Sequence, residues 1–454
     1  MAHSPEVSDD IVAAQYRAWV YPQPVEDLEK AVANGEYWDF TDPSLFRRKL
    51  WPRKIEPENL SILIAGCGAN QAAYYAFTNP NARVVGIDIS ETSLGHQAYL
   101  RQRHHLDNLE LFRLSLTQVA ALGRTFDLIV STGVLHHLPD PEAGLRCLRD
   151  VLNPHGVMSL MLYGYDARFG VYMMQEAFRL LGLQQDAAGV EIVKSAIHTL
   201  PSWHHVQSYV NEATDLHYDS AFVDTFLHPV DRAFTVAQVL QFARENNLRF
   251  QSWVDNLDYS ISASITDAQN PLRRAVETVP LPDQWRLVEL IAQNLPCHRF
   301  LLCHPEKDEA DYALDFSGSK WLDYVPTVRH PLQVSGKPAI TANASPAITA
   351  DTSTARIFWL ILVHLLTRMS PGRRRSQSVA SHVNREAVVL NRRWHTMELD
   401  ALETALLDRI DGTRSIREIS RTLSAEGDGE RLLSAAGQFF RHMAEWDHFL
   451  YRIP

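Results

Sequence analysis

The stretch from Leu60 to Pro141 constrains this 454-residue chain more than any other. It begins with a short apolar run, Ser61–Ala65, of the kind that forms a strand buried on both faces. Gly66-Cys67-Gly68 follows directly, and two glycines let a backbone turn sharply and approach a ligand closely. A second apolar run, Arg83–Asp88, ends in an acid. The strand, glycine turn, helix and acid-tipped strand together predict one half of a nucleotide-binding α/β sheet.

The turn and the acid narrow the range of ligands. Asn70 is expected to cap the helix that starts here, and free N–H groups at a helix start suit a carboxylate or a phosphate. Asp88 is expected to accept hydrogen bonds from both ribose hydroxyls of a nucleoside. A dinucleotide site would need a third glycine where Gln71 stands. A nucleoside that carries a carboxylate instead of a pyrophosphate is therefore favoured over a nicotinamide cofactor.

Five segments resemble, in order, the motifs of the class I S-adenosylmethionine-dependent methyltransferases. The first is a strand that runs into G-x-G, and the second is the acid that ends the next strand. The third is the turn that holds the adenine, and the fourth contains STGVLHHLPDP. The fifth is the fifth strand with the turn that precedes it. The matching segments are Ile62–Gly68, Asp88, Leu114–Leu116, Phe126–Pro141 and Leu152–Leu160.

The resemblance implies an α/β fold with a Rossmann-like seven-stranded methyltransferase sheet that is interrupted by insertions. It also implies S-adenosylmethionine as the cofactor and methyl transfer as the activity. Family members often carry an acid where this chain has Ser115, so Ser115 or a backbone group is expected to bind the adenine. The cofactor-binding residues that the match implies are Gly66, Cys67, Gly68, Asn70, Asp88, Ile89, Ser115, Leu116, Ser131, Thr132 and Gly133.

Two histidines follow the fourth predicted strand, close to the expected position of the methyl group. His136 is the candidate catalytic residue, because imidazole can act as a base at neutral pH. The alternative is that His136 packs beneath the adenine and His137 caps the local turn. No metal is expected, because no tight cluster of histidines or carboxylates stands in the sequence. The residues expected to line the substrate pocket are Tyr21, Tyr163, Tyr165 and Tyr172.

Periodicity and composition divide the chain into four parts. Residues 1–58 form an arm that either closes over the cofactor as a lid or only caps the sheet edge. Residues 59–306 form the methyltransferase domain. Its two insertions, 166–232 and 255–296, are expected to build the substrate cap, because insertions at the carboxyl ends of strands usually do so. An Ala/Thr/Ser/Pro-rich tract within residues 307–355 predicts a connector.

Residues 356–454 are expected to form a smaller, mostly helical second domain. The segment LLDRIDGTRSIREIS resembles the small winged-helix domains related to the peptide chaperone of pyrroloquinoline quinone biosynthesis. Such domains bind peptides or dimerise, so a homodimer through this domain is one expectation. Its predicted helices are Leu399–Ile410, Ser415–Leu423 and Arg431–Trp446.

Composition limits the partners. A formal net charge of −11 argues against a general binder of nucleic acid. The longest apolar run, Ile357–Leu366, is too short to span a bilayer. The first residues lack the apolar core of a signal peptide. A cytoplasmic protein without a membrane partner is therefore expected.

Three functions remain open. The favoured one is in-line transfer of a methyl group to a small-molecule acceptor in a capped pocket. The second is a protein or peptide methyltransferase whose C-terminal domain binds the substrate. The third is a catalytically silent regulatory protein that binds the cofactor. The acceptor atom, whether N, O, S or C, also stays open.

Overall fold

A computed structural model describes the protein at residues 12, 14–16, 18–35, 41–53, 59–213, 215–293, 295–329, 333–335, 388–392, 395–424 and 429–454. The described residues divide into two units. The first lies within Met1–Val32, Glu56–Val254 and Ser264–Lys307. The second lies within Ala33–Ile55, Asp255–Ala263 and Asp308–Pro454.

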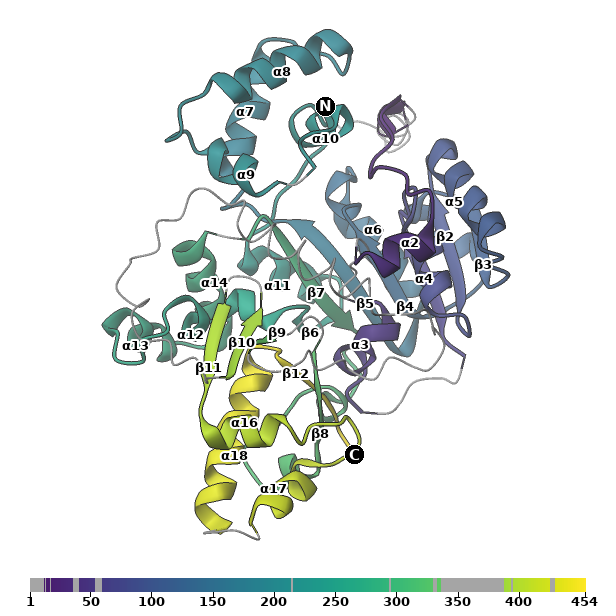
Figure 1. Cartoon of the computed structure of the whole chain (residues 1–454). Helices are drawn as coiled ribbons and strands as arrows, with labels where there is room; N and C mark the ends of the chain where they lie inside the picture. The colour runs from purple at the N-terminus through teal and green to yellow at the C-terminus, as the bar shows by residue number, and fades with distance from the viewer. Residues whose placement is uncertain are drawn as a thin grey trace. The chain divides into compact units, whose positions relative to one another are not determined.

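A seven-stranded sheet forms the centre of the first unit, with the strand order β3-β2-β1-β4-β5-β7-β6 (Figure 1). Neighbours among β1 to β5 pair in parallel, whereas β7 is antiparallel to β5 and β6. This confirms the Rossmann-like methyltransferase sheet. The strands are β1 Ser61–Ala65, β2 Arg83–Asp88, β3 Leu109–Arg113, β4 Phe126–Thr132, β5 Leu152–Tyr163, β6 Arg249–Trp253 and β7 Cys297–Cys303.

Apolar strands explain the burial of this sheet. Ile62, Leu63 and Ile64 of β1 have no exposed surface, as expected for a central strand that is covered on both faces. Helices and 3-10 turns connect the strands, and the carboxyl ends of β1, β2 and β4 meet at one edge. The connecting elements are α4 Gln71–Thr78, α5 Glu91–Arg103, η1 Leu116–Leu122, η2 Leu135–His137, α6 Pro141–Asp150, α11 Val236–Glu245, α13 Pro271–Glu277 and α14 Leu281–Ala292.

The first insertion folds into a helical group with its own core. Its helices are α7 Phe169–Leu180, α8 Ala187–Thr199, α9 Val206–Glu212 and α10 Asp219–Phe226, which are drawn in teal in Figure 1. Each helix turns apolar residues inward, so that the group buries a shared cluster. That cluster includes Val171, Phe178, Val193, Val206 and Phe226.

Gly170 lets α7 and α9 come close together. A Cβ atom at this position would lie 2.2 Å from the backbone nitrogen of Val206 and 2.6 Å from the carbonyl oxygen of His205. We expect Gly170→Ala to destabilise the protein by about 1–3 kcal/mol, because backbone atoms must move apart. Gly95→Ala on α5 is the matched control, since its Cβ would meet no atom within 4 Å. Equal unfolding temperatures for the two variants would contradict this packing.

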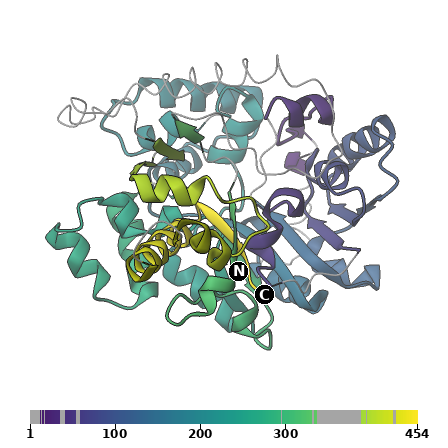
Figure 2. The same cartoon turned by 60° about the horizontal axis from the view of Figure 1, so that its bottom comes forward.

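The second unit combines short strands with a group of helices near the C-terminus. β8 Val325–Val328 pairs with β12 Phe449–Arg452, and β10 Val388–Arg392 lies between β9 Gln333–Ser335 and β11 His395–Leu399. Helices α16 Ala401–Leu407, α17 Ile416–Ser424 and α18 Gly429–Glu445 lie together, as the yellow-green and yellow ribbons of Figure 2 show. Their inward residues share one apolar core, which includes Leu406, Ile416, Ile419, Phe440 and Met443. The remaining helical elements are α2 Leu28–Ala33, α3 Pro43–Leu50, η3 Asn256–Tyr259, α12 Ile261–Ser264, η4 Glu309–Asp311 and η5 Lys320–Asp323.

The second unit starts earlier along the chain than predicted. Residues 33–55 were expected in the arm but belong to this unit. A buried ion pair explains the difference, because Lys49 Nζ lies 2.9 Å from both carboxylate oxygens of Asp447. Residues 308–329 were expected in the connector, yet β8 lies among them and pairs with the C-terminal strand.

The second predicted insertion, 255–296, is also divided. Its first residues, Asp255–Ala263, belong to the second unit. Leu257 and Ala263 pack on Trp446, whose indole Nε1 donates a hydrogen bond to Ser262 Oγ. The expected substrate cap therefore cannot contain the whole of 255–296.

Some sequence predictions fall outside the described residues. They concern residues 36–40 of the arm, the Ala/Thr/Ser/Pro-rich tract, and residues 356–387 of the C-terminal domain. The three predicted C-terminal helices correspond to α16, α17 and α18, while the winged-helix resemblance stays a prediction. Within the described part of the chain, no helix is long and apolar enough to cross a membrane.

Candidate cofactor and acceptor site

The glycine turn after β1 has the geometry that the sequence predicted. Gly66 has a φ of +78°, and the N–H groups of Gly66 and Cys67 both donate to the carbonyl oxygen of Ile87. A Cβ atom on Gly66 would lie 2.3 Å from Cγ2 of Val134, so a side chain would not fit. Cys67 is buried, and burial raises the pKa of its thiol, so it acts as a small packing residue.

Asp88 joins the turn to the end of β2. Its Oδ2 accepts a hydrogen bond from the Gly68 N–H at 2.8 Å, and its Oδ1 accepts one from the Ser90 N–H at 2.8 Å. Burial raises the pKa of the Asp88 carboxyl, and these two backbone donors oppose that rise. The side chain is only partly covered, as is that of Ile89. A carboxylate at this sheet edge fits the ribose of a nucleoside cofactor, because the neighbouring glycine turn lets the backbone come close to a ligand.

The other predicted cofactor residues fall into two groups. Ser115 and Gly133 are partly exposed and Thr132 is exposed, all at the ends of strands where a ligand can reach them. Leu116 is buried at the start of η1. Ser131 is 1% exposed, and its hydroxyl donates to the carbonyl oxygen of Ala65, so it ties β4 to β1 and does not face a ligand.

Asn70 occupies the predicted cap position but does not cap the helix. Its side chain makes no hydrogen bond to the first turn of α4. Instead Oδ1 accepts from the Val25 N–H at 3.0 Å, and Nδ2 donates to the Gln23 carbonyl at 2.8 Å. The residue therefore holds the N-terminal arm in place.

The arm covers the glycine turn. A Cβ atom on Gly68 would lie 3.3 Å from Pro22 Cδ and 3.8 Å from the carbonyl oxygen of Tyr21. The Tyr21 hydroxyl donates to Asp215 Oδ2 at 2.7 Å, so the same short segment also reaches the first insertion. The arm thus lies on the turn and on the helical group within one unit.

A buried carboxylate from the insertion lies behind the arm. Asp224 of α10 is 3% exposed, and its two oxygens accept from the hydroxyls of Tyr16, at 2.9 Å, and Tyr163, at 3.3 Å. Burial raises the pKa of both phenols, so they stay protonated and donate. Burial also raises the pKa of the Asp224 carboxyl, and the neighbouring His137 and the Tyr16 hydrogen bond oppose that rise.

Arg168 at the start of α7 is enclosed by tyrosines. Its guanidinium carbon lies 3.8 Å from the ring centre of Tyr163, 4.9 Å from that of Tyr209 and 5.8 Å from that of Tyr172. It also forms an ion pair with Asp231 at 3.5 Å, and both side chains are 2% exposed. Arg168 therefore balances the charge of Asp231.

Three of the four predicted pocket tyrosines come together here. Tyr21 and Tyr163 bond the aspartates, and Tyr172 packs on Arg168. Tyr165 stacks on Tyr172 but is 44% exposed, so it lies at the outside. Sequence reasoning missed Tyr16, Asp215, Asp224 and Arg168. A weak signal was present for Asp224, since it stands among apolar residues and a buried acid normally needs a partner.

The two histidines after β4 differ in their surroundings. His136 has no exposed surface, and neither of its nitrogens has a hydrogen-bond partner in the described structure. Burial lowers its pKa well below the ordinary value, so the ring is neutral. Its ring centre lies 3.9 Å from that of Tyr163, which makes His136 a packing residue and not the base that the sequence suggested.

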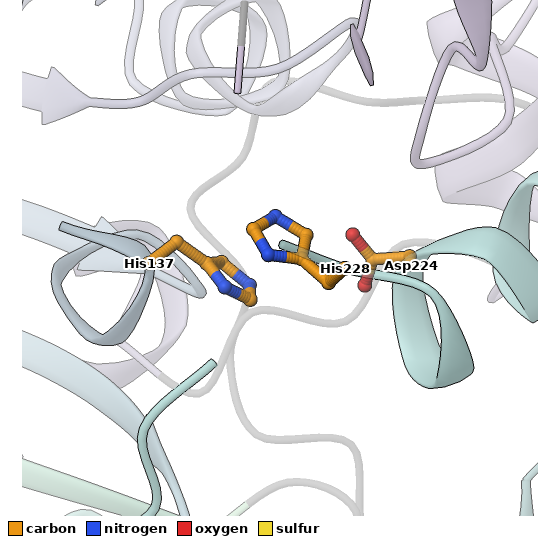
Figure 3. A group of neighbouring side chains, drawn as sticks. All are labelled: His137, Asp224 and His228. Carbon is orange, nitrogen blue, oxygen red and sulfur yellow. The ribbon is translucent and has the colours of Figure 1, made fainter. Parts of the chain in front are cut away.

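His137 faces the insertion. Its ring stacks on that of His228 with centres 3.8 Å apart, and Asp224 lies beside them, as Figure 3 shows. One ligating atom from each of these three side chains lies within 4.8 Å of the others. The sequence does not reveal this cluster, because the insertion separates His137 from its two neighbours by more than eighty positions.

Comparisons with known proteins match the part of the chain that contains the glycine turn and Asp88. A family model described as a methyltransferase domain matches residues 63–158. An uncharacterized protein of Synechococcus sp., syc1184_c, is 29% identical over 69% of this chain and 76% of its own length. The tRNA 5-carboxymethoxyuridine methyltransferase of Escherichia coli is 30% identical over 24% of this chain and 42% of its own length.

A solved structure extends the likeness to most of the chain. PKMT2 from Rickettsia typhi, in complex with AdoHcy, has a TM-score of 0.61 and 15% identity. The match covers 91% of this chain and 76% of that one. At this identity the comparison establishes a shared fold. The family model and the shared fold therefore agree on a methyltransferase-like domain in the first unit, and AdoHcy is the ligand in the structure of PKMT2.

Proposed function

We propose that this protein, whose first unit is a class I S-adenosylmethionine-dependent methyltransferase domain, transfers the methyl group to an amine held between the arm and the first insertion. The cofactor supplies an electrophilic methyl group on sulfur for in-line displacement. The observation that carries the choice of an amine is the pair of carboxylates, Asp215 and Asp224, among tyrosines beside the glycine turn.

The chain's own residues divide the binding work. Asp88 accepts the ribose hydroxyls, and the Gly66–Gly68 turn lets the backbone approach the amino-acid end of the cofactor. Ser115 and Leu116 lie where the adenine is expected. The arm at Tyr21 covers the turn and excludes water, which strengthens the electrostatic interactions inside the site.

The charge of the pocket supports a cationic acceptor. Arg168 balances Asp231, whereas neither Asp215 nor Asp224 forms an ion pair with lysine or arginine among the described residues. Two carboxylates therefore remain to attract a positive group. Tyrosine faces add attraction for an ammonium. A carboxylic acid or a phosphate would be repelled here.

The burial of Asp224 limits the size of the acceptor. Asp224 is 3% exposed, which supports a small-molecule amine that the site can enclose completely. The second candidate is an amine on a protein side chain. In favour of this candidate, the fold shared with PKMT2 covers 91% of this chain and so extends into the second unit. The second unit is the part that would bind the substrate of a protein or peptide methyltransferase.

Sinefungin tests the acidic pocket, and the test needs no acceptor molecule. This cofactor analogue carries an ammonium where S-adenosylmethionine carries the sulfonium methyl. We expect Asp224→Asn to weaken sinefungin binding by about 10- to 100-fold, since a hydrogen bond between charged groups is worth roughly 1.5–3 kcal/mol. Binding of S-adenosylhomocysteine, which is neutral at sulfur, should stay nearly unchanged. Isothermal titration calorimetry measures both.

Asp219→Asn is the matched control, because Asp219 is exposed on the same helix. It should change neither affinity. Equal losses of both ligands in Asp224→Asn would mean that this aspartate only supports the fold. If Asp224→Asn does not weaken sinefungin binding selectively, the argument for an amine acceptor fails.

A further inference from the structure

We infer that His137 is the catalytic base, which removes a proton from the acceptor amine before the amine attacks the methyl group. The inference rests on the proposed function and names a residue for one of its steps. An amine enters a pocket of carboxylates as an ammonium, which has no lone pair. A proton must therefore leave before the nitrogen can act as a nucleophile.

The hydrogen bonds of His137 leave a nitrogen free to accept that proton. Its Nδ1 lies 2.7 Å from the carbonyl oxygen of Val230, which can only accept, so Nδ1 carries the hydrogen. In the neutral ring, Nε2 then holds the lone pair, and it has no hydrogen-bond partner among the described residues. A backbone carbonyl thus fixes the tautomer that a base requires.

Val230 also fixes the ring of His228. Its N–H donates to His228 Nδ1 at 3.1 Å, so the proton of this neutral ring is on Nε2. Burial lowers the pKa of His228 well below its ordinary value, which keeps the ring neutral. His228 Nε2 is buried and has no acceptor in the described structure. It is therefore a hydrogen-bond donor beside the base.

Two histidines and one carboxylate are also a common metal-binding set. A metal needs a lone pair from each histidine. His228 offers none while Val230 N–H occupies Nδ1 and the proton occupies Nε2. The positions of the hydrogens on the two rings therefore favour proton transfer over metal binding in this cluster.

Asp224 lies beside the proposed base. Its carboxylate has an atom within 4.8 Å of a nitrogen of His137, and Tyr16 and Tyr163 hold it in place. The other titratable or charged groups packed around His137 are His136, His228 and Tyr163, with Arg168 and Asp231 behind them. The two neighbouring rings are neutral, and Arg168 is balanced by Asp231.

The reaction moves one proton to His137 and one methyl group to nitrogen. The ammonium gives one proton to His137 Nε2, and its nitrogen keeps the electron pair. That pair forms the nitrogen–carbon bond as the carbon–sulfur bond breaks, and the electrons of the broken bond stay on sulfur. The products are the methylated ammonium, neutral S-adenosylhomocysteine and a protonated His137. The imidazolium returns its proton to water after release.

The test compares His137→Gln with the wild type, using spermidine and Nα-acetyllysine as probe amines. We expect kcat at neutral pH to fall by about 10²- to 10⁴-fold, the usual contribution of a general base, with KM nearly unchanged. The deficit should shrink at high pH, where the amine loses its proton in solution. His198→Gln, on the exposed side of α8, should behave like the wild type.

Binding of S-adenosylhomocysteine checks that His137→Gln is folded, and nitrogen-15 NMR of the wild-type histidines gives a second readout. The inference predicts an unprotonated Nε2 in His137 and a protonated Nε2 in His228. A wild-type rate and pH profile for His137→Gln would overturn it while leaving the proposed function intact. One bound metal per purified chain, lost in both His137→Gln and His228→Gln, would also overturn it. No transfer by the wild type to any amine would overturn the proposed function itself.

Discussion

Replacing Asp88 with alanine is expected to lower the affinity for S-adenosylhomocysteine by about 10²- to 10⁴-fold. The carboxylate is expected to accept two ribose hydroxyls, and each such bond to a charged group is worth roughly 1.5–3 kcal/mol. It also accepts the Gly68 N–H at 2.8 Å, so its loss loosens the turn that approaches the cofactor. Titration calorimetry measures the change directly.

Two variants separate binding from folding. Asp107→Ala removes an exposed aspartate from the loop before β3 and should bind like the wild type. Asp88→Asn keeps the size of the side chain and one accepting oxygen, so it should bind between Asp88→Ala and the wild type. Wild-type affinity in a folded Asp88→Ala would show that the cofactor does not sit on this carboxylate.

Replacing Arg168 with methionine is expected to destabilise the protein by about 3–5 kcal/mol. Arg168 and Asp231 are each 2% exposed, and the variant would leave a buried carboxylate without its cation. The Gln175 amide, 2.8 Å from Asp231 Oδ2, supplies only a neutral donor. Chemical denaturation measures the loss.

A double variant identifies the cause. Arg168→Met combined with Asp231→Asn removes both charges, so it should recover part of the stability lost in the single variant. The exposed pair of Arg179 and Glu176 on α7 provides the comparison, and Arg179→Met should cost about 0–1 kcal/mol. If Arg168→Met lowers the free energy of unfolding as little as Arg179→Met does, then Arg168 does not balance the buried charge of Asp231.

The sheet could be predicted because its signals are local. Apolar runs such as Ser61–Ala65 and Arg83–Asp88 match β1 and β2 residue for residue. A central parallel strand must be apolar on both faces, so the pattern is visible without knowledge of its neighbours. The glycine turn could also be predicted from local sequence, because its positive φ values exclude most residues other than glycine.

The proposed acceptor site could not be predicted in the same way. Tyr16 and Asp224 are 208 positions apart, and only the folded chain brings them to 2.9 Å. The unit boundaries failed for a similar reason, because Lys49 pairs with Asp447 almost at the other end of the chain. Asn70 was assigned its usual local role as a cap, but contacts with the arm replaced that role.

Mass spectrometry of the methylated products is the decisive measurement of methyl transfer from S-adenosylmethionine to an amine. The protein is incubated with S-adenosylmethionine that carries a deuterated methyl group, together with spermidine, Nα-acetyllysine, a lysine-rich peptide or catechol. We expect a labelled methyl group on an amine nitrogen and none on the catechol oxygen. Labelled catechol without any labelled amine, or a cofactor that binds but transfers to none of the four, would contradict this expectation.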